Sequence, residues 1–253
     1  MTVSSYPRAD DKVRTTAYHE TGGGNAANTA CAMALLCDAS LFKSENFRIK
    51  LLSKVGDDST GQQLKDELQK SGVDVSLVCI GDQGTTTGFT SVIVSEAEHT
   101  RTCLHTPGTC GELTLVDIAS ENLEELFVDV VHLHCDSRNA DVSLMLAKEA
   151  HKRNISISVD AEKDRQSKSL DRLLEITDMV FTNSNQLHDY LDRWTGELEA
   201  KHKRRPLTVP IISTIGGNPT LLGICAKGVF PCHFFQRWYE TKTNKKKELI
   251  ITK

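Results

Sequence analysis

Residues 128–182 decide the fold; they are VDVVHLHCDSRNADVSLMLAKEAHKRNISISVDAEKDRQSKSLDRLLEITDMVFT. Short β-branched runs alternate in this stretch with longer runs of helix-forming residues. The expected strands are Val128–Leu133, Ile155–Val159 and Met179–Thr182, and the expected helices are Ala140–Arg153 and Leu170–Thr177. Such alternation is typical of a mainly parallel sheet with helices on both faces. The sequence therefore predicts an α/β fold with a Rossmann-like sheet.

The alternation extends outward on both sides of this stretch. The further expected helices are Asn25–Cys37, Thr60–Ser71 and Asn185–Leu191, and the further expected strands are Leu51–Val55 and Pro210–Thr214. Gly72 is placed to end the second of these helices in the left-handed conformation that glycine favours.

Residues 75–105 have a different character from the rest. Three short β-branched runs, Val75–Ile80, Thr86–Val94 and Arg101–Leu104, are separated by glycine and charged turns. They predict a small antiparallel sheet, and Lys12–Glu20 has the composition of an exposed strand. We expect one α/β domain over residues 1–228, with lid strands near 12–20 and 75–105.

The last residues, 229–253, break the pattern and are expected to form a divergent tail. Pro231–Tyr239 concentrates aromatic residues without a clear period. It suggests an exposed apolar patch, either an interface or an aggregation liability. Lys242–Lys253 is rich in lysine, and a frayed, solvated end is the favoured interpretation. A nuclear signal or a patch for an acidic partner in Lys242–Lys247 is the alternative.

Composition narrows the class of protein. The net charge of −4 lacks the basic excess of a nucleic-acid binder. No apolar run is long enough to cross a membrane, and residues 1–14 have no apolar signal core. The eight cysteines form no Cys-x-x-Cys pair, so we expect free thiols and a cytoplasmic protein.

The run GGGNAAN, residues 22–28, is the most informative local feature. Glycines let a ligand approach the backbone, and a helix start just beyond them offers free N–H donors. Asn25 and Asn28 add amide groups suited to hydroxyl groups. A tight turn without a ligand is the alternative. The run also matches a loose dinucleotide fingerprint, but the segment before it is polar rather than an apolar strand.

Several ordered motifs resemble the PfkB/ribokinase family of carbohydrate kinases, most closely its ketohexokinase-like branch. They are YPRADDKVR (6–14), GGNAAN (23–28), KVGDDSTG (54–61), SGVDV (71–75), RTCLH (101–105), SRNA (137–140), VDAEKDR (159–165) and DMVF (178–181). They span roughly residues 5–225 in family order. The resemblance implies a ribokinase-like core with a β-sheet lid, and MgATP-dependent phosphorylation of a hydroxyl group on a sugar or nucleoside. It also implies a homodimer formed through the lid.

The resemblance implies roles for individual residues. Those expected to contact the substrate are Asp10, Gly24, Asn25, Asn28 and Arg101, and those expected on the nucleotide side are Asn183, Thr214 and Gly216. Asn183 matches the start of the family's Asn-x-x-Glu element, in which Gln186 replaces the glutamate. No residue is assigned as a metal ligand.

Two family features are not found in these residues. The late Gly-Ala-Gly-Asp element, which supplies the catalytic base, has no counterpart, since the last aspartate is Asp192. Only Met1–Ser5 precede Tyr6, where the family has an apolar strand ending in a substrate-binding aspartate. We therefore assign no catalytic residue and expect an impaired kinase, truncated at both ends of its active site. The alternatives are a non-catalytic sugar-binding or regulatory pseudokinase and, more distantly, a nicotinamide-dependent enzyme.

The run His132-Leu133-His134-Cys135-Asp136 contains residue types that bind zinc. On a strand the two histidines share one face and Cys135 points away, and no second ligand pair follows at a suitable spacing. A structural role, or one at the rim of the active site, is favoured.

Overall fold

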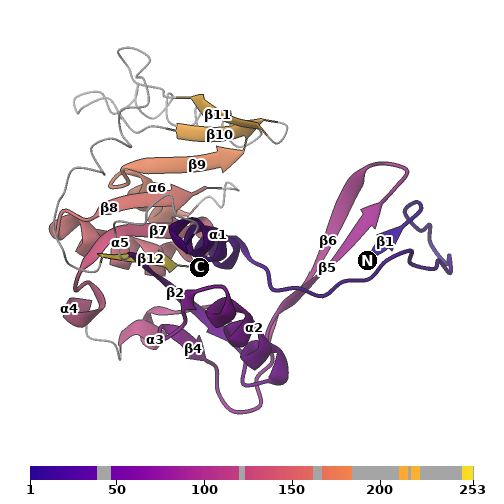
Figure 1. The fold of residues 1–253 in the computed structure, drawn as a ribbon, viewed down its shortest axis with the longest axis horizontal. Coiled ribbons are helices and arrows are strands. Elements are labelled where there is room, and N and C mark those ends of the chain that lie inside the picture. The colour runs from indigo at the N-terminus through magenta and orange to yellow at the C-terminus, as the bar shows by residue number, and fades with distance from the viewer. Residues whose placement is uncertain are drawn as a thin grey trace.

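A nine-stranded sheet forms the core of the computed structural model, which describes residues 1–38, 47–119, 123–161, 167–183, 211–215, 218–222 and 247–252 (Figure 1). Its strands are β2 (Phe47–Val55), β3 (Val73–Asp74), β4 (Val78–Ile80), β7 (Val130–Asp136), β8 (Ser156–Asp160), β9 (Met179–Asn183), β10 (Ile211–Ile215), β11 (Asn218–Leu222) and β12 (Lys247–Thr252). The order is β11-β10-β9-β8-β7-β12-β2-β3, and β4 pairs with β2 outside that path. Every pairing is parallel except that of β10 with β11. The predicted fold class is confirmed.

Residues 128–182, the deciding stretch, fold as expected. Strand β7 is followed by the 3-10 turn η1 (Ser137–Asn139), helix α5 (Ala140–Lys152), β8, helix α6 (Lys168–Leu174) and β9. The Ser167 hydroxyl caps α6 by accepting from the N–H of Leu170. The predicted strands and helices of this region are confirmed to within a few residues.

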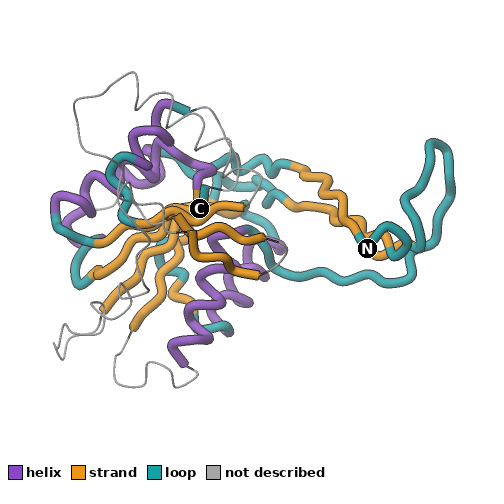
Figure 2. Tube along the Cα trace, turned by 90° about the horizontal axis from the view of Figure 1, so that it is seen from above, coloured by secondary structure: helices purple, strands orange, loops and turns teal. Residues whose placement is uncertain are grey.

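Helices cover both faces of the sheet, as Figure 2 shows. The helices outside the deciding stretch are α1 (Asn25–Asp38), α2 (Ser59–Lys70), α3 (Leu115–Ala119) and α4 (Leu123–Leu126). One apolar cluster joins Leu52, Leu133 and Ile157 of the sheet to Leu146 of α5 and Leu170 of α6. The other joins β2 to α1 and α2. Because neighbouring residues of a strand face opposite ways, Leu51 and Leu52 enter different clusters.

The predicted helices at 25–37 and 60–71 appear as α1 and α2. Helix α1 approaches the sheet through Ala26, Ala30 and Ala34, whose small side chains are buried. Gly72 follows α2 with φ of +83°, as its predicted capping role requires. Residues of this part of the sequence therefore form the elements that their pattern indicated.

The lid is a separate three-stranded sheet of β1 (Thr2–Val3), β5 (Phe89–Ser95) and β6 (Thr100–Thr106). Strands β5 and β6 form an antiparallel hairpin that projects from the core (Figure 1). Two predictions about the lid are wrong. Residues 75–80 belong to the core, because Val78–Ile80 pairs with β2. Residues 12–20 form no strand, and only Ala17 bridges to Thr2.

The frayed end predicted for Lys242–Lys253 is wrong for residues 247–252. They form β12, which lies between β7 and β2 and is parallel to both. Ile250, Ile251 and Thr252 are completely buried. Ile250 packs in the cluster of α5 and α6, and Ile251 packs in the cluster of α1 and α2. The lysine-rich composition hid a short apolar run whose two faces are both covered in the fold.

At the β11 edge of the sheet, the predicted strand 210–214 is confirmed as β10, and β11 was not anticipated. The expected helix Asn185–Leu191, Gly216 and the aromatic patch Pro231–Tyr239 lie outside the described residues. Among the described helices, none has the length and apolar character needed to span a bilayer. The cytoplasmic location stays a prediction.

Candidate functional site

The carboxyl ends of the parallel strands bring polar residues together at one edge of the core sheet. Asp57 follows β2, Asp136 and Asp160 end β7 and β8, and Asn183 ends β9. This edge is where parallel α/β sheets usually bind their ligands. Asp136 and Asp160 are register partners on adjacent strands, so their Cα atoms are neighbours. This pair was not predicted from the sequence, although each aspartate is the last residue of a largely buried strand.

Helix α1 begins at the same edge. Ala34, in its second half, lies beside Gly72, and the next residue, Val73, pairs with Ile49 near the start of β2. The helix therefore runs antiparallel to β2, and its first residue, Asn25, lies toward the carboxyl ends of the strands. The predicted residues at the start of α1 thus lie at the same edge of the sheet as these aspartates.

The glycine run leads directly into the start of α1, as expected from the sequence. Gly24 has φ of +96°, a conformation that side chains disfavour. Its carbonyl accepts from the N–H of Asn28 at 2.9 Å, which closes the first helical turn. The Asn25 side chain is half-buried and Asn28 is exposed. The roles of these residues in binding stay predictions.

The structure does not bring Asp10 to this helix start. The Tyr6 hydroxyl lies 3.1 Å from the Thr100 hydroxyl at the far end of the lid hairpin. Thr16, on the other side of Asp10, donates its N–H to the carbonyl of Thr2 in the lid sheet. Asp10 therefore sits in a loop held at both ends by the lid, away from Asn25. Its predicted contact with a sugar shared with α1 is not supported by this arrangement.

The two faces of the lid differ in chemistry. Arg101 and His105 are four positions apart on β6, so they lie on the same face. His105 contacts Arg138 of the core, which shows that this face is turned toward the strand ends. Phe89 and Leu104 lie on the opposite face and are more than half exposed. Arg101 is exposed on the face turned toward the site, although it lies near the far end of the lid.

Arg138 connects the lid to the core. The sequence assigned it no role of its own beyond its place in the SRNA motif (137–140). Its backbone N–H is held by the carboxylate of Asp136, which caps η1. Its Nε lies 3.2 Å from Oε1 of Glu112. Its terminal nitrogen lies 3.3 Å from Nε2 of His105. One guanidinium therefore touches both the lid strand β6 and the segment by which the chain returns from the lid.

On the nucleotide side, two predicted residues are neighbours. Asn183 of β9 and Thr214 of β10 are register partners at the ends of parallel strands. The third, Gly216, lies outside the described residues. Among the residues that the structure covers, three or more His, Cys, Asp or Glu side chains gather nowhere as a metal site. The nucleotide roles of the three residues stay predictions.

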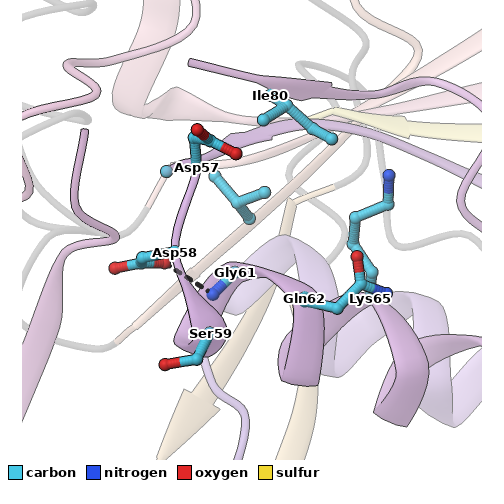
Figure 3. A pocket seen from close by; sticks show the side chains of 9 residues that line it. Asp57, Asp58, Ser59, Gly61, Gln62, Lys65 and Ile80 are labelled. Carbon is cyan, nitrogen blue, oxygen red and sulfur yellow. Dashed lines mark hydrogen bonds between the residues drawn. The ribbon is translucent and has the colours of Figure 1, made fainter. Parts of the chain in front are cut away.

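The hinge of the lid is built around Asp58, shown in Figure 3 capping α2 through the N–H of Gly61 at 2.8 Å. The same carboxylate accepts from the Thr87 N–H at 2.8 Å and from the Thr87 hydroxyl at 2.7 Å. The N–H of Thr87, more than any other group, lowers the pKa of Asp58 below its ordinary value. Burial opposes this shift, and the Thr87 hydroxyl and the Gly61 N–H add to it. The start of the lid is thereby tied to the start of a core helix.

Glycines make this hinge compact. A Cβ on Gly56 would meet the backbone of Thr86 at 2.4 Å, and a Cβ on Gly108 would meet the carbonyl of Thr86 at 2.3 Å. Beside the hinge is a hollow of about 340 Å³, lined by residues that include Asp57, Lys65 and Ile80 (Figure 3). The two arms of the lid therefore leave the core through a passage that only glycine backbones fit.

The histidines of β7 have a structural environment. Nε2 of His132 lies 2.7 Å and Nδ1 of His134 lies 2.8 Å from the hydroxyl of Ser158 on the neighbouring strand. Burial lowers the pKa of His134 to about 4, and burial together with His134 lowers that of His132 to about 3. Both are therefore neutral at pH 7. Cys135 points into the opposite cluster, where burial raises the pKa of its thiol to about 12. These contacts agree with the favoured structural role.

Comparison with known proteins gives a consistent result. Residues 1–207 match the family described as pfkB family carbohydrate kinase. The ATP-dependent ribose-1-phosphate kinase of Halopiger xanaduensis is 26% identical over 194 residues, which are 76% of this chain and 60% of that protein. The chain thus spans about three fifths of the length of that curated relative.

Solved structures show the same fold. The ribokinase of Thermotoga maritima superposes with a TM-score of 0.61 at 15% identity, over 90% of this chain and 75% of that one. The Burkholderia thailandensis nucleoside kinase in complex with inosine gives a TM-score of 0.59 at 15% identity, over 85% of this chain and 66% of that one. At these identities the likeness concerns the fold.

Proposed function

The chain belongs to the pfkB family of carbohydrate kinases, and we propose that it binds a small sugar or nucleoside at the carboxyl edge of its core sheet, with MgATP as the phosphoryl donor. The observation that carries the proposal is the meeting of the α1 start with the strand ends, under the polar face of the lid. Gly24 takes the positive φ that glycine favours just before the helix, and Asn25 and Asn28 offer amide groups that suit hydroxyl groups.

The nucleotide would lie further along the same edge. Asp160, Asn183 and Thr214 follow one another across adjacent strands β8, β9 and β10. Mg²⁺ bound with a nucleotide takes one or two carboxylates and completes its shell with phosphate oxygens and water. Asp136 and Asp160 would supply carboxylates of this type. When bound, MgATP would supply the phosphoryl group, and the protein would hold it in line with the attacking hydroxyl.

Transfer also requires a carboxylate that accepts the proton of the substrate hydroxyl. The carboxylate of Asp136 is engaged by the N–H of Arg138 in capping η1. The Gly-Ala-Gly-Asp element of the family is absent from these 253 residues. We therefore propose that these residues alone bind their ligands and transfer phosphate poorly. A non-catalytic sugar-binding or regulatory protein is the second candidate function.

The test combines binding with turnover. Purified protein would be titrated by calorimetry with ribose, ribose 1-phosphate, fructose and inosine, with and without MgATP, and each mixture would be assayed for phosphorylated product. We expect sugar or nucleoside binding that Asn25→Ala weakens at least tenfold. Gln69→Ala, which alters an exposed side chain on α2, serves as the matched control.

The outcomes separate the candidates. Binding with slow turnover supports an impaired kinase, and binding without turnover supports the second candidate. Turnover at rates ordinary for kinases, about 1–100 per second, contradicts the impairment. Absence of binding to all four compounds, in a protein shown to be folded, refutes the proposed site. Binding of NAD without ATP would favour the nicotinamide-dependent alternative.

We also propose that the lid mediates a homodimer. Phe89 and Leu104 lie on the face of the lid turned away from the site and are 56% and 54% exposed. Ile93 lies on the same face of the hairpin, one pair beyond Leu104 toward the hairpin turn. An apolar face on a projecting hairpin is a surface that a second copy can cover.

A further inference from the structure

One guanidinium links the lid to the strand ends, and its partner on the lid is a histidine. Arg138 lies in η1, directly after β7, and its position is fixed by Asp136, which holds its N–H. His105 lies near the end of β6, beside the point where the chain returns to the core. The contact therefore spans the lid and the candidate site without involving the hinge.

The contact with Arg138 requires one particular protonation state of His105. A guanidinium can only donate hydrogen bonds, so Nε2 of His105 must accept from Arg138. The other ring nitrogen, Nδ1, lies 3.1 Å from the hydroxyl of Thr90 on β5 and therefore carries the proton. This is the neutral imidazole. A protonated ring would donate from both nitrogens and carry a charge of the same sign as Arg138.

The surrounding charges sharpen this dependence. Thr90 and Cys103 flank His105 on the same lid face, and Arg101 lies four positions away on it. From the core, Arg138 faces the ring, and Glu112 is the carboxylate paired with Arg138. Glu112 forms its ion pair with Nε of the guanidinium, so the group directly against the imidazole is cationic. A second positive charge on the lid at this point is repelled.

We infer that Arg138 is a positioning residue that holds the lid over the strand ends, and that it holds the lid only while His105 is neutral. The hold fixes the polar face of β6, including Arg101, toward the edge where the α1 start lies. Protonation of the imidazole therefore releases the lid, and its deprotonation restores the contact.

The test measures the lid directly and uses no sugar or nucleotide, so its result is independent of the proposed function. Donor and acceptor dyes would be attached through unnatural amino acids at Glu98, in the hairpin turn, and Lys148, on α5. Both residues are exposed. The distribution of transfer efficiencies would be recorded for single molecules at pH 8 and pH 5.5, with circular dichroism confirming the fold at both values.

Three variants test whether the charge on residue 105 and its contact with Arg138 cause the response to pH. His105→Gln keeps an acceptor for Arg138 and cannot take up a proton. His105→Lys places a permanent charge there, and Arg138→Gln removes the guanidinium. The matched control is His19→Lys, which changes an exposed histidine in the segment before α1.

We expect the unaltered protein to shift to a broader, lower-efficiency distribution at pH 5.5. His105→Lys and Arg138→Gln should show that distribution already at pH 8, and His105→Gln should keep the pH 8 distribution at both values. His19→Lys should behave as the unaltered protein does. The inference fails if His105→Lys and the unaltered protein coincide at pH 8. It also fails if His105→Gln retains the full response to pH.

Discussion

Shortening Ile251 to alanine tests whether β12 completes the core sheet. Ile251 is completely buried and packs among Ala26, Ala30 and Leu51, between the sheet and α1. The change removes three carbon atoms, each worth about 0.8 kcal/mol of transfer free energy. Adding a cavity term, we expect a loss of about 3 kcal/mol in the free energy of unfolding, within the range of roughly 2–5 kcal/mol found for such changes.

The assay is urea unfolding followed by circular dichroism. For a chain of this size, the slope of free energy against urea concentration is at least about 3 kcal/mol per molar, so the midpoint should fall by about 1 M. Ile250→Ala, which removes the same atoms from the opposite face of β12, should cause a comparable fall.

Two controls frame the result. Val116 is 81% exposed, and Val116→Ala should change the free energy by no more than about 0.5 kcal/mol. Leu133 is completely buried on β7, and Leu133→Ala should destabilise as Ile251→Ala does. If Leu133→Ala lowers the midpoint while both isoleucine variants leave it unchanged, β12 does not occupy the slot between β2 and β7 and the argument is refuted.

Further expectations follow from the buried histidines, the lid and its hinge. Because the pKa values of His132 and His134 are lowered to about 3 and about 4, the unfolded chain takes up protons before the folded one does. The free energy of unfolding should therefore fall below about pH 6.5, by up to about 2 kcal/mol per histidine at pH 5. His134→Gln should reduce the fall in the urea midpoint between pH 7.5 and pH 5, and an equally large fall in this variant would contradict the reasoning. Leu104→Asp should convert a lid-mediated dimer into monomers in sedimentation-velocity runs. If the unaltered protein is itself monomeric in these runs, the proposed interface is refuted. Gly108→Ala should raise amide hydrogen exchange at the hinge at least tenfold, since the new Cβ would lie 2.3 Å from the carbonyl of Thr86, and unaltered exchange would show that the passage is wider.

The order of strands and helices could be predicted where local pattern and tertiary context agree. In Ala140–Lys152, helix-forming residues place Val142, Leu146 and Ala150 on one buried face. The pattern failed where context overrode it. Val78–Ile80 has the same composition as a lid strand, yet its pairing with β2 places it in the core. Composition alone does not show whether such a strand pairs within the lid or with β2 in the core.

The candidate site was predictable only in its local parts. The glycine run identified the turn at Gly24 because a positive φ is a property of a few adjacent residues. The Asp136–Asp160 pairing depends on sheet register, and the Arg138–His105 contact depends on how the lid returns to the core. The same dependence on distant geometry explains why Asp10, grouped with Asn25 by family resemblance, lies with the lid instead.

The position of β12 also bears on how the molecule assembles. Ile250 pairs with Lys50 and with Leu133, which precede it by 200 and 117 positions along the chain. Among the described strands, β12 lies between β2 and β7, so the backbone pairing that joins the two halves of the sheet is completed by this segment. Because contacts between residues so distant in sequence carry a large loop-closure cost, closure of this seam should be the slowest folding step. Until it closes, each half presents an open strand edge, and the chain is most exposed to aggregation during that interval.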